Sequence, residues 1–291
     1  MKKFMLHIAL LLLTLVLLMS LFDWVYTYTY ANAVPRNKFQ YIHRMRPQAI
    51  DYVFLGSSRV ADHISATEVR RLTGKTAINL GIEGASYDDN LLELQMLLAR
   101  KVTIKKVILI VDHFYELQGA STFGNAAMLP FIHDPMVTDH FSRQLPDFRA
   151  SYYVPFYRYM KASHVAGFRE FFMSAMGRKT RVDFSDGLIS RVGNTKLKVE
   201  ILPDTLSQRN KCLDSIQAIC DQNQIELVLF CAPYCSKVQN LDYIAKLKQR
   251  YPAMLDYSRT MDDKWFYDCA HLNKEGAIEF TRMLVEKCCE N

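Results

Sequence analysis

The sequence has 291 residues, of which 50% are hydrophobic, 12% aromatic and 23% charged. This length suits one large domain or a domain with an insertion, and the composition is that of a chain that folds over most of its length. The formal net charge of +6 is mild and is not gathered into a Lys/Arg block. The charge therefore gives no indication of nucleic-acid binding and weakly favours an anionic envelope or glycan setting.

The cysteines all lie in the last third of the chain. None forms the paired CxxC or CxxC-with-histidine spacing of a zinc site, so neither a metal nor another cofactor is expected. An exported domain would allow one or two disulfides, which the sequence does not assign, and buried, unpaired thiols are the favoured interpretation. The seven residues are Cys212, Cys220, Cys231, Cys235, Cys269, Cys288 and Cys289.

The amino-terminal segment predicts a membrane anchor. After Met1-Lys2-Lys3, the run Phe4–Phe22 is almost wholly apolar, close to the ~20 residues that span a bilayer. The preceding lysines, with no basic residue until Arg36, predict that the amino end lies inside and the rest of the chain outside. Aromatic residues between 23 and 30 predict a belt at the outer interface. A signal peptide cleaved after residues 31–33 is the alternative, but the apolar run is long for a signal and ends well before Ala31, which favours an uncleaved anchor.

Strand and helix patterns then alternate, which predicts an α/β fold with a doubly wound parallel sheet. The third and fourth strands are continuous apolar runs of the kind that parallel sheets bury on both faces. In the first helix, Ser65 is the expected N-cap, Val69 and Leu72 face inward and Gly74 ends the helix. Strands are expected at Tyr52–Leu55, Thr76–Ile82, Lys106–Val111, Ile225–Cys231 and Met254–Tyr257, and later helices at 87–101, 206–222, 241–250 and 274–287.

Residues from about 116 to 202 lose this alternation. They are rich in Phe, Tyr, Met and His and include several prolines. The segment is too apolar to be disordered, so we expect an inserted, partly helical cap. The expected organisation is an anchor over 1–30 and one α/β domain over 31–291 that carries this cap. The aromatic and basic residues of the cap could form a platform for a glycan, although aromatic stretches more often belong to a core.

Three segments carry candidate chemistry. The strand within Asp51–Arg59 runs into Gly56-Ser57-Ser58, which is how an α/β sheet presents a nucleophile, although a turn or helix cap gives the same pattern. In Asp268-Cys-Ala-His271, the carboxylate can orient the imidazole as a general base. The glycines of 79–84 allow backbone N–H groups to approach an oxyanion.

Taken in chain order, these segments resemble the blocks of the SGNH/GDSL hydrolase superfamily, over roughly 51–111 and 206–286. The resemblance implies a flavodoxin-like sheet, Ser58 as the nucleophile, Gly84 as an oxyanion glycine beside the Ser58 amide, and Asp268 and His271 as the acid and base. Ser57 stands where the family has an Asp and remains a rival nucleophile. No metal and no cofactor are implied.

The sequence departs from this family after the third strand, where the family places an Asn as an oxyanion donor. Here Asp112 and His113 follow the strand. One of them substitutes for the Asn, or the backbone N–H groups of Ser58 and Gly84 suffice. Loss of one such donor costs about 10²–10³ in rate in well-studied enzymes. Arg59, next to the nucleophile, is expected either to contact an anionic substrate or to form a surface salt bridge.

The Gly-Ser-Ser-Arg variant with one amino-terminal anchor is similar to the branch linked to teichoic-acid D-alanylation and alginate O-acetylation. That similarity implies an extracytoplasmic, membrane-anchored serine acyl esterase or O-acyltransferase that acts on cell-envelope polysaccharide. Its partners would be an acylated glycan and a membrane-bound O-acyltransferase, with no nucleic acid. The alternatives are a catalytically weak binding or assembly protein of the same fold, or a lipase or phospholipase near the membrane.

Overall fold

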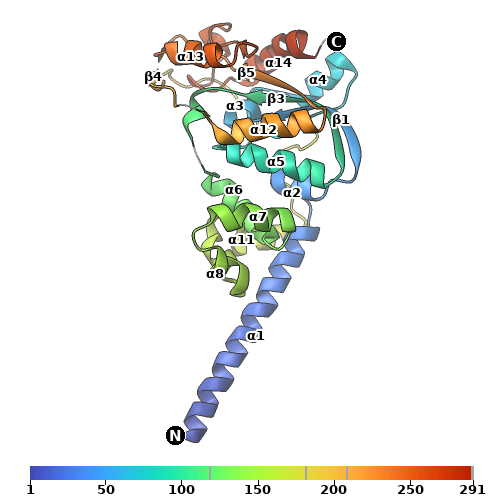
Figure 1. Cartoon of the computed structure of the whole chain (residues 1–291), viewed down its shortest axis with the longest axis vertical. Coiled ribbons are helices and arrows are strands. Elements are labelled where there is room, and N and C mark those ends of the chain that lie inside the picture. The colour runs from blue at the N-terminus through green and yellow to red at the C-terminus, as the bar shows by residue number, and fades with distance from the viewer. Residues whose placement is uncertain (118, 181, 208, 290–291) are drawn as a thin grey trace. The chain divides into compact units, whose positions relative to one another are not determined.

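The computed structural model describes residues 1–117, 119–180, 182–207 and 209–289. Its centre is a five-stranded parallel sheet with the order β2 (Ala77–Asn79), β1 (Gln48–Leu55), β3 (Val102–Ile110), β5 (Glu226–Cys231) and β7 (Leu255–Asp256). The prediction of a mixed α/β fold with a parallel sheet is confirmed (Figure 1).

The apolar runs of the sequence form the middle of this sheet. In β1 and β3, Phe54 pairs with Ile108, and Ile108 pairs in turn with Val228 of β5. Phe54 and Ile108 are fully buried, which is the burial expected of central parallel strands. Because all five strands are parallel, their carboxyl ends lie at one edge of the sheet.

The first predicted helix begins and ends where the local sequence predicts, whereas the helix expected from 206 begins only at Lys211, after its N-cap Asn210. Ser65 caps its helix by accepting a hydrogen bond from the Glu68 N–H, and Gly74 ends it in the left-handed conformation. Leu72, expected to face inward, is instead 40% exposed, because the inner face of this short helix is filled by Val69. The helices are α3 (Ser58–Ala61), α4 (Ala66–Thr73), α5 (Tyr87–Ala99), α12 (Lys211–Gln222), α13 (Asp242–Arg250) and α14 (Lys274–Cys288), with 3₁₀ turns at His113–Glu116 and Asp263–Trp265.

These helices pack in pairs. α5 and α12 lie side by side, and α14 packs against α4 (Figure 1). The second contact includes the ion pair of Arg282 with Glu68 and a hydrogen bond from the Ser65 N–H to the Thr281 hydroxyl. A separate two-stranded ladder joins β4 (Glu200–Ile201) to β6 (Val238–Gln239).

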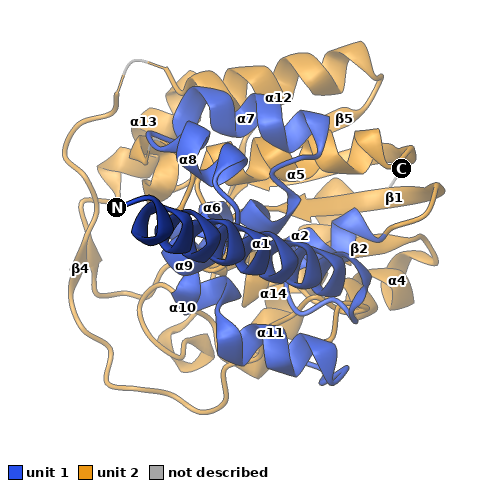
Figure 2. Ribbon diagram, turned by 90° about the horizontal axis from the view of Figure 1, so that it is seen from below, with its two compact units in different colours: residues 1–44, 122–180 blue, residues 45–121, 181–291 orange. Residues whose placement is uncertain are grey.

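Contacts divide the described chain into two compact units, which Figure 2 distinguishes by colour. Unit 2, residues 45–121 and 181–291, contains the sheet. The domain boundaries predicted from the sequence, near residues 30, 116 and 202, stay predictions, because this division by contacts does not test them. Unit 1, residues 1–44 and 122–180, is helical. Its elements are α1 (Lys2–Asn32), α2 (Lys38–His43), α6 (Thr122–Met128), a 3₁₀ turn (Leu129–Phe131), α7 (Pro135–Gln144), α8 (Phe148–Tyr153), α9 (Tyr157–Lys161), α10 (Ser163–Ala166) and α11 (Phe168–Ala175).

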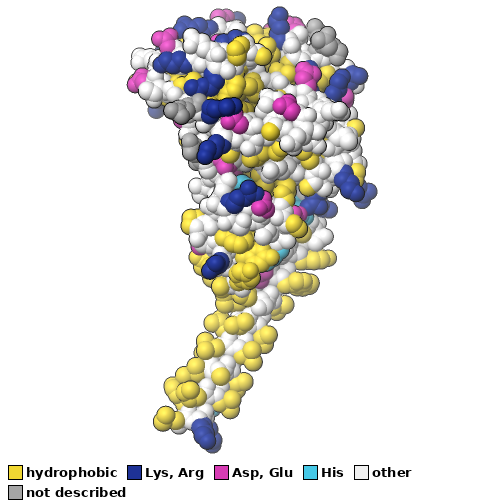
Figure 3. All heavy atoms as spheres, viewed as in Figure 1, with side chains coloured by type: hydrophobic (Ala, Val, Ile, Leu, Met, Phe, Trp, Pro, Cys, Tyr) yellow, Lys and Arg dark blue, Asp and Glu magenta, His cyan; other side chains and the backbone are white. Residues whose placement is uncertain are grey.

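Helix α1 is long and apolar enough to span a membrane or to act as a signal sequence. Apolar side chains cover its surface along the amino-terminal half (Figure 3). The carboxyl-terminal part differs, because Tyr26 and Tyr30 are buried against other helices of unit 1. The amino-terminal part of α1 is therefore apolar and exposed, whereas its carboxyl-terminal part packs against the other helices of unit 1.

Candidate active site

The turn after β1 places two serines at the carboxyl edge of the sheet. Gly56 has a φ of +154°, and a Cβ atom there would lie 2.4 Å from Cγ2 of Ile110, so only glycine fits. Ser57 is the N-cap of α3, and its hydroxyl accepts a hydrogen bond from the Arg59 N–H at 3.4 Å. Ser58 is the first residue of α3.

The structure brings Ser58, His271 and Asp268 into one hydrogen-bonded chain. Ser58 Oγ lies 2.9 Å from His271 Nε2. On the other side of the ring, His271 Nδ1 lies 2.9 Å from Asp268 Oδ1 and 3.1 Å from Oδ2. Ser58 therefore occupies the place of a nucleophile beside a base, and Ser57 has the role of a helix cap.

Asp268 is held as a carboxylate by its surroundings. Burial by itself raises the pKa of this carboxyl, but hydrogen bonds and charge from His271 outweigh burial and lower the pKa. The backbone N–H groups of Ala270 and His271 also donate to Oδ1, at 3.0 and 2.9 Å. An ionised Asp268 keeps a proton on Nδ1, so Nε2 is free to accept the proton of the Ser58 hydroxyl.

Two backbone donors predicted for an oxyanion are available. Within the residues that the structure describes, the N–H groups of Ser58 and Gly84 donate to no group of the chain. Gly84 is exposed, with a φ of +71° that favours glycine, and hydrogen bonds from Ile82 to Gly56 and from Ala85 to Ile82 close the turn around it. These N–H groups are the candidates for stabilising negative charge on a substrate oxygen.

Asp112, offered from the sequence as a substitute donor, is fully buried and pairs with Arg59 at 2.8 Å. Its other oxygen accepts from the Phe114 N–H at 2.9 Å. A carboxylate that accepts from these groups has no proton to donate, so Asp112 does not replace the missing Asn. The expectation of a surface salt bridge for Arg59 is also wrong, since Arg59 is 0% exposed.

His113, the other substitute, fits the donor role better. Its Nδ1 lies 2.7 Å from the hydroxyl of Tyr234. Burial raises the pKa of Tyr234 well above its ordinary value, so the phenol keeps a proton that it can donate to Nδ1. Burial also lowers the pKa of His113, which favours a neutral ring with its hydrogen on Nε2. His113 can therefore donate from Nε2.

Arg59 braces the candidate site from inside the protein. Its Nε donates to the Ala270 carbonyl at 3.1 Å, and Nη2 donates to the carbonyls of Ala232 and Pro233 at 2.8 and 2.5 Å. The guanidinium also lies over the ring of Tyr234, 3.7 Å from its centroid. One side chain thus joins the serine turn to the loop before His271. Sequence reasoning missed this role, although an Arg directly after the serines and an Asp at the end of β3 are the signal for it.

A disulfide also holds the histidine loop. Cys235 is bonded to Cys269, which immediately follows Asp268. The expectation of unpaired thiols is wrong for these two residues, because the fold brings the loop after β5 beside the loop before α14. It agrees with the other five cysteines, which are free. Burial raises the pKa of Cys212 to about 12, as it does for Cys220, so these thiols are not activated nucleophiles.

A cavity of about 600 Å³ opens beside His271 and Asp268. One wall is the segment 195–200, which includes Lys196 and Lys198, and the other is 267–271. Thr195 fastens this segment by donating from its N–H and its hydroxyl to the Tyr267 carbonyl. This part of the predicted cap therefore borders the candidate site.

Arg191 connects the segment before this wall to the end of α3 and to the turn that contains Gly84. It forms an ion pair with the buried Asp62 and a second pair, at 3.2 Å, with Glu83, the neighbour of Gly84. Among the described residues, no group of three or more His, Cys, Asp or Glu side chains could hold a metal ion.

No protein-family model matches the chain, and no curated protein matches it. One similar solved structure is described as "a putative platelet activating factor from Streptococcus pneumonia"; it is 12% identical, with a TM-score of 0.39, and the match covers 96% of this chain and 97% of that one. A similarity this low assigns neither a fold family nor an activity.

Proposed function

We propose that the protein is a serine acyl esterase or O-acyltransferase of the SGNH type, and that Ser58, His271 and Asp268 are its catalytic triad. The observation that supports this proposal is the pair of hydrogen bonds that links the three side chains. Ser58 Oγ lies 2.9 Å from His271 Nε2, and His271 Nδ1 lies 2.9 Å from Asp268 Oδ1. The proposed fold is a doubly wound, flavodoxin-like sheet. Its support is the parallel strand order together with the separate helix pairs α5–α12 and α4–α14.

In the proposed reaction, Ser58 Oγ attacks the ester carbonyl carbon as its proton passes to His271 Nε2. The N–H groups of Ser58 and Gly84 and Nε2–H of His113 stabilise the oxyanion. When the intermediate collapses, the bond to the leaving alcohol breaks and His271 returns the proton to that alcohol. Water or a sugar hydroxyl then attacks the acyl-serine by the same route, which releases the acid or the acylated sugar.

The proposed location is outside the cytoplasm, with α1 as the anchor. Two features support it: the lysines stand before the apolar run, and a disulfide lies within two residues of His271. Cytosolic proteins seldom keep structural disulfides, because the thiol pool reduces them. The proposed substrate is an acyl ester of an envelope polysaccharide, with a membrane-bound O-acyltransferase as a partner. The cavity is open and is bordered by charges of both signs, which supports a large polar substrate rather than an enclosed small molecule.

The test is acetyl release from a chromogenic acetyl ester by the full chain in detergent. We expect Ser58→Ala to lower kcat by about 10³–10⁶-fold, as loss of the nucleophile does in serine hydrolases. Ser57→Ala is the matched control and should keep most of the activity. A fluorophosphonate adduct mapped to Ser58 supports the proposal, whereas an adduct on Ser57, or unchanged turnover in Ser58→Ala, would overturn it. A preference for long-chain over acetyl esters would instead indicate a lipase.

A second candidate is a binding or assembly protein of the same fold with weak catalysis. The observation that favours it is that Asp112, at the third-block position, is committed to Arg59 and donates nothing. In that case Ser58→Ala leaves surface-glycan acetylation in cells unchanged, while loss of the chain abolishes it. Measuring both variants in cells separates the two functions.

A further inference from the structure

Unit 1 presents a second apolar surface beside the part of α1 that packs against other helices. Six large hydrophobic side chains between 153 and 176 are exposed, two of them by 73%. A soluble surface seldom gathers so many in one short stretch. They are Tyr153, Val154, Met160, Phe168, Phe172 and Met176, and we refer to them as the apolar collar.

The collar is fixed to α1 at the end of its apolar run. The Phe156 N–H donates to Asp23 Oδ2 at 2.8 Å, and Asp23 Oδ1 pairs with Arg158 at 2.6 Å. The rings of Phe22 and Phe156 are 5.9 Å apart. Tyr153 and Val154 directly precede this attachment. They are therefore held near the residue at which a spanning α1 would leave the hydrocarbon.

Helix α11 is fixed one turn further along α1. The ring of Phe171 stacks on Tyr26 with centroids 4.0 Å apart. Tyr26 is four residues beyond Phe22, which is about 6 Å along a helix. Phe168, Phe172 and Met176 follow one another at intervals of four, so they form one exposed stripe next to the side on which Phe171 contacts Tyr26. An apolar helix face at this depth matches interfacial helices, which bury about 5–10 Å into the headgroup boundary.

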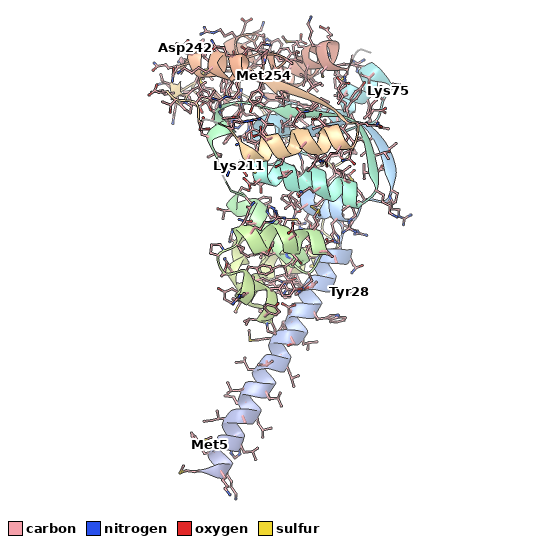
Figure 4. The ribbon with its side chains drawn as sticks, viewed as in Figure 1. Met5, Tyr28, Lys75, Lys211, Asp242 and Met254 are labelled. Carbon is pink, nitrogen blue, oxygen red and sulfur yellow. A yellow bond between two sulfur atoms is a disulfide. The ribbon has the colours of Figure 1, made fainter. Side chains whose placement is uncertain are left out.

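Charge around the collar fits an anionic lipid surface. Arg149, Arg169, Arg178 and Lys179 are exposed, whereas the one acidic residue between 148 and 180, Glu170, is paired with Arg36. Exposed cations beside exposed aromatic rings are the composition of membrane-surface segments. On α1 itself, Tyr28 projects away from the other helices, as Figure 4 shows, and stacks with Trp24.

We propose that the apolar collar inserts into the headgroup layer of the membrane that α1 crosses, so that unit 1 lies on the lipid surface. This inference goes beyond the proposed chemistry and does not depend on Ser58. It requires that α1 stays attached. Unit 1 then contacts the lipid surface through the collar in addition to the α1 anchor.

The test uses the full chain in nanodiscs of equal parts phosphatidylcholine and phosphatidylglycerol, with lipids brominated on the upper acyl carbons. A Phe172→Trp variant is made in a Trp24→Phe, Trp265→Phe background, and Phe123→Trp is the matched control on α6. Phe123 is also exposed, by 39%, but lies outside the collar. We expect the lipid to quench the tryptophan at 172 at least about two-fold more strongly than the one at 123, because only the first lies at the boundary between headgroups and upper acyl carbons.

Equal, weak quenching at the two positions would overturn the proposal, since the collar would then be in water. A blue-shifted tryptophan at 172 that brominated lipid does not quench would also overturn it, because a protein partner or a second copy would then cover the face. Phe168→Trp repeats the measurement at a more exposed position, which guards against misfolding of the first variant. Arg169→Glu with Lys179→Glu should lower the quenching in these nanodiscs and leave it unchanged in phosphatidylcholine alone.

Discussion

The two units hold their buried charges in different ways. In unit 2, Arg59 and Asp112 are both fully buried, and the other two nitrogens of the Arg59 guanidinium donate to backbone carbonyls. In unit 1, Arg158 is buried but its partner Asp23 is partly exposed, and stacked aromatic rings lie beside this pair. Directional hydrogen bonds fix atoms in position, whereas apolar packing tolerates displacement. The buried arginine of unit 2 is therefore held by directional hydrogen bonds, which position the candidate site, whereas unit 1 depends more on apolar packing.

Loss of the buried arginine in each unit tests this contrast most strongly. We expect Arg59→Met to destabilise unit 2 by about 3–5 kcal/mol, because Asp112 is left charged and buried without a partner. Arg158→Met should cost unit 1 only about 1–2 kcal/mol, since Asp23 keeps the Phe156 N–H and reaches water. Hydrogen exchange of peptides from β3 and α9 measures each unit separately.

A further variant sharpens the first result. Adding Asp112→Leu to Arg59→Met removes the orphan carboxylate and should recover most of the lost stability of β3, although not the position of the His271 loop. Acetyl release should therefore stay low in the double variant. Equal losses in the two units, or full activity in the double variant, would contradict the assigned role of Arg59 as a brace.

The disulfide gives the next largest expected effect. The bond closes a loop with a sequence separation of 34 residues, for which chain entropy predicts about 3–4 kcal/mol. Cys235→Ser with Cys269→Ser should lower the stability of unit 2 by this amount, and unit 1, which contains no cysteine, should be unaffected. Cys212→Ser is the control, because its thiol is free. Unchanged exchange in β5 after mutation would refute this prediction.

Sequence reasoning captured the features that depend on local pattern. The buried run of β3, the Ser65 cap and the left-handed Gly74 follow from neighbouring residues and are confirmed. The β5 run forms a strand as predicted, but only Phe230 and Cys231 of that strand are buried. Contacts between distant segments were not predictable in the same way. Arg59 meets Ala232 across 173 positions, and Cys235 meets Cys269 only because two loops share one sheet edge. The proximity of Ser58 to His271 was expected only through the resemblance of three segments, since no spacing within one segment implies it.

Removal of the His113 imidazole tests its proposed role as an oxyanion donor. We expect His113→Ala to lower kcat for acetyl release by about 10–100-fold with little change in KM, since an oxyanion donor acts in the transition state. Tyr234→Phe removes the hydroxyl that orients the imidazole but keeps the ring under Arg59, so its effect should be smaller. A rise in KM with kcat unchanged would place His113 in substrate binding instead.

Mild acid should lower the stability of unit 2 more than that of unit 1, and this is the smallest of the expected effects. Burial, followed by the charges of Arg59 and His271, lowers the pKa of His63 well below its ordinary value. Its Nε2 accepts from the Leu272 N–H at 3.1 Å, as a neutral ring requires. The unfolded chain binds this proton near pH 6.5 but the folded chain does not. The stabilisation is therefore complete above about pH 6.5 and falls below it by up to about 1.4 kcal/mol per pH unit. His63→Asn keeps an acceptor for Leu272 and should reduce the dependence of unit 2 stability on pH by about one proton.

The matching histidine of unit 1 is His133, whose pKa is also lowered by burial but which is less enclosed. His133→Asn should therefore change the pH dependence of unit 1 stability less. Hydrogen exchange of each unit from pH 7 to 5 measures both slopes, and a steeper slope in the His63→Asn variant would refute the assignment of a neutral, buried His63.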